Sequence, residues 1–227
     1  MQVTEEAEKQ KTSLHGITEP IELVFYTDPL CCWSWAMHKE LEKLISELGD
    51  TITVRYCMGG LLSDWEHYHD TVNSISRPLQ MGPLWMEVRH RTGAQLEDRI
   101  WFTDPPASSY PACIAVKCAG MQGDDTGIQM YRLLQQAIMT EVKNIAKTEV
   151  ILEIAGRVNG LDKHAFEASL LDGSGIPHFR KDLEEVRLLG IERFPALKIS
   201  SQGRSLMITG YRNYDTLAAG IRKLISR

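Results

Sequence analysis

The chain has 227 residues, of which 43% are hydrophobic, and this supplies enough apolar material for one full core. Lys and Arg together number 25 and Asp and Glu number 30, so the formal net charge is −5. Because phosphate binding needs concentrated positive charge, this acidic balance argues against a nucleic-acid partner. No stretch approaches the roughly 20 apolar residues of a membrane-spanning helix, so we also expect no membrane partner.

The five cysteines are odd in number and few for a chain of this length, so they do not predict a disulfide framework. Residues 1–11 lack the basic-then-apolar order of a secretory signal, and we expect residues 1–18 to form a polar, flexible lead. The expected compartment is the reducing cytoplasm, where thiols stay free unless they are catalytic or regulatory.

The first half of the predicted sheet is a strand, a helix and a second strand. Ile21–Thr27 is a short run of apolar, β-branched and aromatic residues that favours a buried strand, and Asp28-Pro29 breaks it. Apolar residues recur at helical spacing from Trp33 to Leu48. Thr51–Cys57 is the second strand. A crossover of this kind favours parallel pairing of its two strands.

Between residues 61 and 189 the periodicity is helical and no strand is convincing, which predicts an almost wholly helical segment. Two short strands separated by a turn follow, and a helix closes the chain. The helices within the segment are expected near 109–120, 128–139, 149–158, around 166 and at 178–189, the strands at 196–200 and 205–209, and the last helix at 213–226.

Cys31 falls where the first strand passes into the first helix. A thiol at a helix N-terminus faces unpaired backbone N–H groups and the positive end of the helix dipole, and both favour the thiolate, which is the nucleophilic form. The position therefore predicts a reactive Cys31 with a pKa moderately below the roughly 8.5 of a free cysteine.

The order of elements and the residues around Cys31 resemble the DsbA-like branch of the thioredoxin superfamily. That branch often carries Asp-Pro-x-Cys-x-Trp-Cys-Trp at this junction, and Asp28, Pro29, Cys31, Trp33 and Trp35 match it. The resemblance covers nearly all of the chain from residue 21 to the end. It implies an α/β thioredoxin fold (β-α-β … β-β-α) with a four- or five-stranded sheet, formed by residues 19–60 and 190–227. A large all-helical insertion occupies residues 61–189.

A second motif of the family lies before the third predicted strand. The loop that ends in Phe194-Pro195-Ala196 resembles the family's cis-proline loop, with Pro195 in the proline's place. The resemblance implies a cis bond between Phe194 and Pro195 and a substrate-binding edge formed by these two residues. Phe194 is bulkier than the usual residue at its position and is expected to narrow access to the thiol.

One departure from the family pattern affects the chemistry. The resolving cysteine of a Cys-x-x-Cys pair would stand three residues after Cys31, and that residue is Ser34. A hydroxyl is too weakly acidic to release a mixed disulfide near pH 7, so only monothiol exchange remains, with Ser34 tuning the Cys31 thiolate. The adjacent Cys32 would form a strained ring with Cys31. Cys32 is therefore expected to be a secondary thiol, exposed enough to react with oxidants.

The remaining candidates are expected to be structural. Cys57, Cys113 and Cys118 are predicted core residues, and His67 and His69 are predicted solvated loop residues, so no metal site is expected. The tryptophans divide by position: Trp33 and Trp35 are expected to form an apolar rim beside Cys31, and Trp85 and Trp101 to pack the insertion.

These features favour a cytoplasmic monothiol oxidoreductase, in which Cys31 forms a mixed disulfide with a protein thiol or with glutathione as co-substrate and no cofactor is bound. Two alternatives stay open, because the family that the chain resembles also contains members with other functions. The first is a non-catalytic thioredoxin-fold adaptor, since one relative in this branch delivers a transcription regulator to the ClpXP protease. The second is a glutathione-dependent transferase or isomerase of kappa type, although those enzymes use Ser at the position of Cys31. Oligomeric state is left open.

Overall fold

The computed structural model describes residue 14 and residues 16–226. The described strands are β1 Ile21–Thr27, β2 Ile52–Met58, β3 Ala196–Ser201 and β4 Arg204–Thr209. The helices are α2 Cys32–Leu48, α3 Met81–Thr92, α4 Ile100–Thr103, α5 Tyr110–Gly120, α6 Asp124–Met139, α7 Thr148–Ala155, α8 Lys163–Leu171, α9 Gly175–Leu188 and α10 Tyr214–Ile225, with short 3₁₀ turns η1 Gly49–Thr51 and η2 Pro78–Gln80.

The four strands form one mixed sheet in the order β2-β1-β3-β4. β1 and β2 are parallel, with Ile21 opposite Ile52 and Thr27 opposite Met58. β3 is antiparallel to both β1 and β4. The α/β thioredoxin-type sheet predicted from the sequence is therefore confirmed, and β1 occupies the predicted residues.

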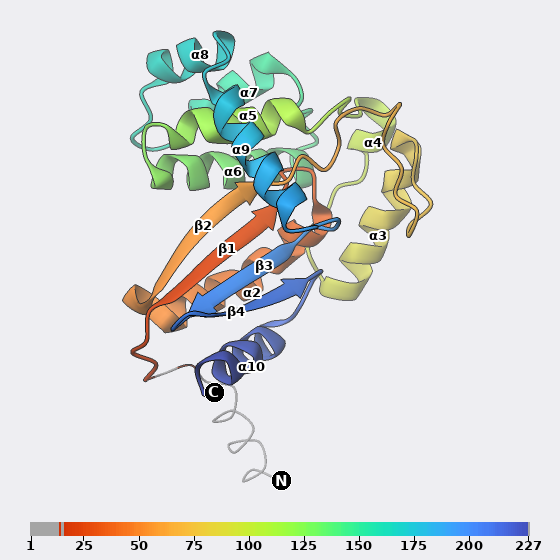
Figure 1. Cartoon of the computed structure of the whole chain (residues 1–227). Coiled ribbons are helices and arrows are strands. Elements are labelled where there is room, and N and C mark those ends of the chain that lie inside the picture. Colours follow the sequence, from red (N-terminus) through yellow and green to blue (C-terminus); the bar gives the residue numbers. More distant parts are fainter. Residues whose placement is uncertain (1–13, 15, 227) are drawn as a thin grey trace.

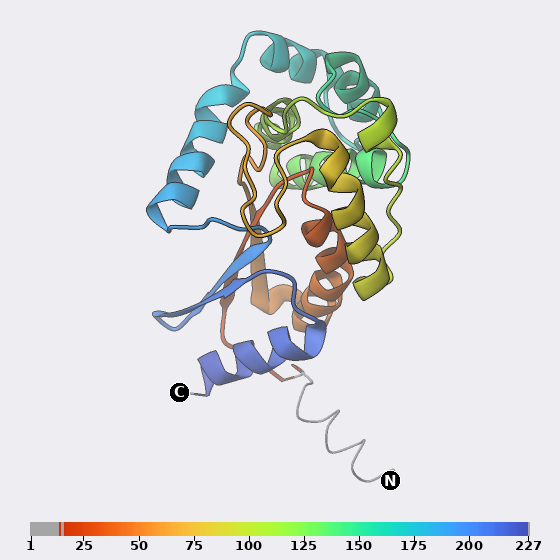
Figure 2. The same cartoon turned by 90° about the vertical axis from the view of Figure 1, so that its right-hand side faces the viewer.

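Helices cover the sheet unequally. α2 and α10 lie against one face, and α9 lies across the other face near the end where β1 and β2 finish (Figures 1 and 2). The helices α5 to α8 gather beyond that same end (Figure 1). One buried cluster runs from the sheet through α2 into these helices, and a smaller cluster of Tyr26, Cys57, Val186 and Ala196 lies beneath α9. Cys31, directly after β1, therefore lies where the sheet meets the helical part.

No strand of the sheet comes from the described residues between β2 and β3, as predicted. Residues 59–77 form a long loop with one isolated bridge between Asp70 and Ile75 (Figure 2, orange), so the prediction of an almost wholly helical segment is wrong for residues 61–77. The Asp70 carboxylate accepts the N–H groups of Val72 and Asn73 and so stabilises a turn instead of a helix. The division into two domains stays a prediction.

The N-terminal lead is described only in part, because residues 1–13 and 15 lie outside the described residues. Leu14, which the sequence analysis places in this polar lead, is 1% exposed and belongs to the core. Its N–H donates to Glu47 Oε1 on α2 at 2.7 Å. The apolar contact and the hydrogen bond together fix this point of the chain against α2.

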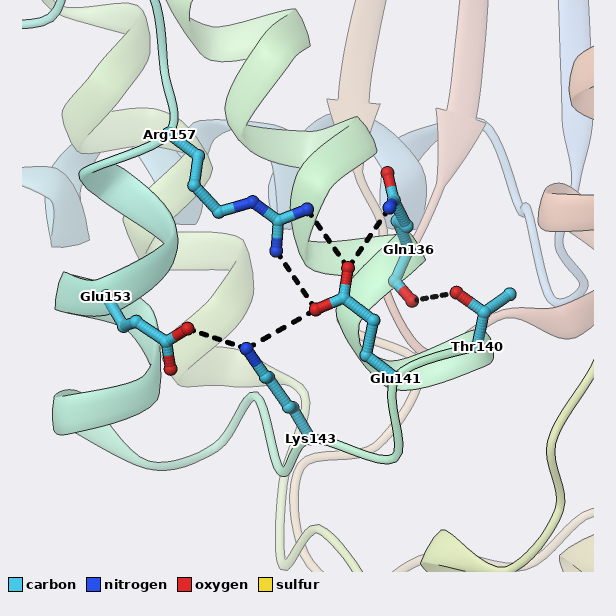
Figure 3. A network of polar contacts seen from close by, with 6 residues as sticks. All are labelled: Gln136, Thr140, Glu141, Lys143, Glu153 and Arg157. Atoms are coloured by element: carbon cyan, nitrogen blue, oxygen red, sulfur yellow. Dashed lines mark hydrogen bonds and ion pairs between the residues drawn. The ribbon is translucent and has the colours of Figure 1, made fainter.

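A polar network ties the end of α6 to the α7 region (Figure 3). The Glu141 carboxylate accepts two hydrogen bonds from Arg157, each of 3.0 Å, and a third of 3.0 Å from Gln136 Nε2. Lys143 bridges Glu141 at 3.4 Å and Glu153 at 2.6 Å. Exposed pairs contribute at most about 1 kcal/mol each, so this network fixes the geometry of the loop more than it stabilises the fold.

Candidate functional site

Cys31 is the N-cap residue of α2. Its backbone is extended, with φ −78° and ψ 104°, and its Sγ accepts the N–H of Ser34 at 3.4 Å. The Cys31 N–H donates to Asp28 O at 2.9 Å, which closes the turn that follows the Asp28-Pro29 break. The sequence places Cys31 at this junction correctly.

The state of the Cys31 thiol differs from the expectation. The residue is only 4% exposed, and burial raises the pKa of its thiol to about 11, although hydrogen bonds from Ser34 act in the opposite direction. The nearby Asp28 carboxylate raises the pKa further. The predicted pKa below that of a free cysteine is therefore wrong, because desolvation of the thiolate exceeds the stabilisation that the helix N-terminus provides. Burial therefore favours the thiol of Cys31 over its thiolate.

The two neighbouring candidates are also enclosed. Ser34 is fully buried. Cys32 is 2% exposed, and burial, with the adjacent Cys31, raises the pKa of its thiol well above the ordinary value. The expectation that Cys32 is exposed enough to react with oxidants is therefore wrong, because its side chain packs into the main core.

Asp28 holds the segments around Cys31 together, a role that the sequence did not predict for it. Its Oδ1 accepts Leu30 N–H at 2.8 Å, and its Oδ2 accepts Leu61 N–H at 2.6 Å, Ser109 Oγ–H at 2.8 Å and Cys113 Sγ–H at 3.3 Å. The residue is completely buried, and burial raises the pKa of its carboxyl. Asp28 therefore joins the Cys31 turn to the loop after β2 and to the start of α5. Its place in the Asp-Pro motif was the available signal.

Phe194 and Pro195 form the end of the loop before β3. Their peptide bond is cis, the isomer expected from the sequence. The Phe194 ring lies against the backbone of Gly59, where a Cβ atom would overlap it. Phe194 and Cys31 both line one pocket, and Pro195, just behind Phe194, is buried.

This pocket has a volume of about 760 Å³, within the range of ligand pockets. Its wall is built by the Cys31 turn, the 59–73 loop, α3 and the two loops that flank the β3–β4 hairpin. Trp33 lies in the wall between Tyr211, whose ring centroid is 6.1 Å away, and the Arg91 guanidinium at 4.9 Å. Trp35 does not line the pocket, and its Nε1–H donates to Gln95 O at 2.9 Å. Of the two tryptophans expected to form a rim beside Cys31, only Trp33 is among the described residues of the pocket wall.

The other sequence candidates divide between core and loop. Cys57, Cys113 and Cys118 are fully buried and Trp85 and Trp101 pack inside the helical part, as predicted. His67 and His69 are exposed at the mouth of the pocket, and His67 Nδ1 lies 2.7 Å from Asp64 Oδ1. Within the described residues, no three His, Cys, Asp or Glu side chains come together as a metal site.

The family comparison agrees with this geometry. Residues 24–219 match the family model described as thioredoxin. The chain belongs to the thioredoxin family. This match includes both the Cys31 turn and the Pro195 loop.

Two curated relatives of this thioredoxin-family chain share the name ClpXP adapter protein SpxH. ClpXP adapter protein SpxH of Halalkalibacterium halodurans is 24% identical over 199 residues, which cover 86% of this chain and 65% of the relative. The Bacillus subtilis protein of the same name is 27% identical over 202 residues, with 87% and 65% covered. The chain thus spans just under two thirds of the length of these relatives.

Solved structures with the same fold include a putative protein disulfide isomerase from Nitrosomonas europaea, with a TM-score of 0.75, 20% identity and coverage of 92% of this chain and 98% of the other. The cytosolic disulfide reductase DsbM from Pseudomonas aeruginosa has a TM-score of 0.69 at 21% identity, with 90% and 98% covered. At these identities the likeness establishes the DsbA-like thioredoxin fold alone. Within the described residues, no helix is both long enough and apolar enough to cross a bilayer.

Proposed function

We propose that this chain is a protein-binding module of adaptor type, which holds a segment of a partner protein in the Cys31 pocket without thiol turnover. The observation that carries the proposal is the state of Cys31. Its thiol is buried with a pKa raised to about 11, and the position of a resolving cysteine holds Ser34. Disulfide exchange starts from a thiolate, which burial of Cys31 disfavours, and release of the mixed disulfide within the motif needs a second thiol, which Ser34 does not supply.

The named relatives support the same function. Each is named a ClpXP adapter, and the similarity covers 86% and 87% of this chain. We therefore propose that the chain binds a protein substrate of ClpXP and presents it for degradation in the cytoplasm. The partners in this proposal are proteins, not nucleic acid or membrane.

A degradation assay tests the adaptor function. Purified ClpXP from the same organism is incubated with its soluble proteome, with and without the chain, and protein half-lives are measured by quantitative mass spectrometry. We expect a small set of proteins to be degraded faster when the chain is present, and to the same extent with Cys31→Ala. If no half-life changes with either form, the adaptor function is wrong.

The second candidate is the monothiol oxidoreductase, and the N-cap position of Cys31 favours it. Cys31 is among the residues that line the pocket, and its Sγ accepts the Ser34 N–H at 3.4 Å, a contact that would stabilise a thiolate. In this candidate Cys31 forms the mixed disulfide with a protein or glutathione, Ser34 tunes the thiol, and Trp33, Phe194 and Pro195 shape the substrate-binding edge. Mass spectrometry after incubation with oxidised glutathione tests this candidate. A glutathione adduct on Cys31 that forms, and that reduced glutathione then removes over repeated turnovers, would support the oxidoreductase over the adaptor.

A kappa-type transferase or isomerase is the remaining candidate. A glutathione conjugation assay with an electrophilic aryl halide separates it from the other two, because neither of them forms a thioether.

A further inference from the structure

The charges around the Cys31 pocket are not those of the chain as a whole. Three arginines line it: Arg91 from α3, Arg193 from the loop before β3 and Arg212 from the loop after β4. The chain carries a net charge of −5, and the pocket wall is a place where three guanidinium groups gather. Because they come from three separate segments, only the folded chain brings them together.

Contacts within the structure orient two of these arginines. The Arg91 guanidinium lies over the Trp33 ring at 4.9 Å and pairs with Glu87 one turn earlier on α3 at 3.0 Å. Arg212 donates its Nη1–H to Tyr211 O at 2.7 Å. Each of these contacts uses part of a guanidinium that has five N–H donors, so donors remain for a ligand.

Carboxylates also lie in and beside the pocket wall. Asp70 and Glu192 are the two carboxylates among the described lining residues. Asp70 is engaged in its own loop, where Oδ1 accepts two backbone N–H groups and Oδ2 accepts Asn73 Nδ2–H at 2.6 Å. Glu192 is exposed at the rim. Glu87 pairs with Arg91, and Arg193 is close enough to Asp70 to act on its carboxylate, so the positive charge is partly offset. A guanidinium has five N–H donors, and those left over can pair with a ligand carboxylate.

We propose that the pocket selects an acidic segment of the partner protein, whose Asp or Glu carboxylates pair with Arg91 and Arg193 while its apolar atoms contact Trp33. This inference rests on the proposed protein-binding function and names the class of segment that the site binds. Arginine suits this task because its planar fork pairs with a carboxylate through two parallel hydrogen bonds. The pocket of about 760 Å³ has room for a short extended peptide.

Peptide binding to the full chain tests the inference. The probes are two fluorescein-labelled decapeptides of alternating Glu and Ala, or alternating Gln and Ala, with anisotropy measured at 50 mM and 200 mM NaCl. We expect the Glu peptide to bind at least tenfold more tightly than the Gln peptide at 50 mM and to weaken at 200 mM, since salt screens exposed charges. The double variant Arg91→Gln with Arg193→Gln should lose at least tenfold in affinity for the Glu peptide.

Arg180→Gln is the matched control, because Arg180 is an exposed arginine on α9 outside the pocket wall. It should change the affinity less than twofold. Equal binding of the two peptides, no binding of the Glu peptide at 1 mM, or an unchanged affinity in the double variant would each overturn the inference. The adaptor function is judged separately: if ClpXP degradation is stimulated equally by the double variant, the function stands and the acidic selection is wrong.

Discussion

The Phe194 ring lies directly on Gly59, in the space that the Cβ atom of any other residue at position 59 would occupy. This contact joins the loop before β3 to the end of β2. Phe194, Gly59 and Cys31 line the same pocket. We expect access to the Cys31 thiol to depend on Phe194, a side chain that the usual pattern of the family would make smaller.

Removal of this ring is expected to expose the thiol. In Phe194→Ala, Cys31 should be more hydrated, its pKa should fall toward the ordinary value, and its labelling by iodoacetamide at pH 8.5 should rise at least about tenfold. Peptide mass spectrometry resolves the labelling of each cysteine. Phe102→Ala removes a ring that is 58% exposed on α4 and should leave the rate unchanged. An unchanged Cys31 rate in Phe194→Ala would show that Phe194 does not limit access.

Any side chain at position 59 is expected to lower the free energy of unfolding. Gly59→Ala forces the Phe194 ring to move and should destabilise the fold by about 1–3 kcal/mol, as overpacking does. Urea unfolding measures the effect. Gly120→Ala is the control, since a Cβ there would meet only Gly127 Cα at 4.0 Å. Equal stability of the two variants would contradict the packing described for Phe194.

Asp28 is expected to be required for the fold of the site. Asp28→Asn replaces an acceptor of four donors by an amide that must turn an N–H toward some of them. A loss of about 1–3 kcal/mol should follow for each buried donor left without an acceptor. The free energy of unfolding in urea gives the size, with the exposed Asp50→Asn as control. A loss below about 0.5 kcal/mol would mean that Asp28 does not organise the turn.

His38, on α2, is expected to make stability depend on pH. Burial lowers the pKa of its imidazole to about 4, whereas an unfolded histidine titrates near 6.5. The unfolded chain therefore binds the proton more strongly, and stability is lost as the pH falls from about 6.5 to about 4, by up to about 3 kcal/mol. His38→Gln should flatten this slope in urea unfolding, and the exposed His178→Gln should not. Parallel slopes for His38→Gln and the unmodified chain would refute the assignment.

The topology was readable from the sequence because each element carries a local signal. The apolar run at Ile21–Thr27 and the spacing of Leu41, Leu44 and Leu48 depend on neighbours a few residues away. Residues 59–77 carry no such signal, and their loop is fixed by Asp28 and by the Asp70 turn.

The site was predicted less completely, because burial is set by distant residues. The position of Cys31 follows from local sequence, but its pKa is raised mainly by burial, which only the folded chain sets. Arg91 and Arg212 are separated by 121 positions in the chain, and Arg193 lies between them. Only the fold shows that all three share a pocket with Trp33.

Ser34→Cys is expected to restore the missing thiol of the motif. Because the Ser34 N–H already lies 3.4 Å from Cys31 Sγ, a cysteine here should form a disulfide with Cys31 under mild oxidation. Thiol titration of the denatured, oxidised protein should then give two free thiols fewer than for the reduced protein. Ser34→Ala should show no such loss, and a full thiol count in oxidised Ser34→Cys would contradict the geometry of the turn.

The measurement that bears most directly on the account is the role of Cys31 in partner capture and turnover. Wild-type chain and Cys31→Ala are compared in two assays, ClpXP-dependent degradation and glutathione-coupled disulfide reduction. The account predicts equal stimulation of degradation by both forms and no disulfide reduction above background by either. Loss of degradation in Cys31→Ala, together with disulfide reduction that only the wild type performs, would contradict it and establish Cys31 as a catalytic thiol.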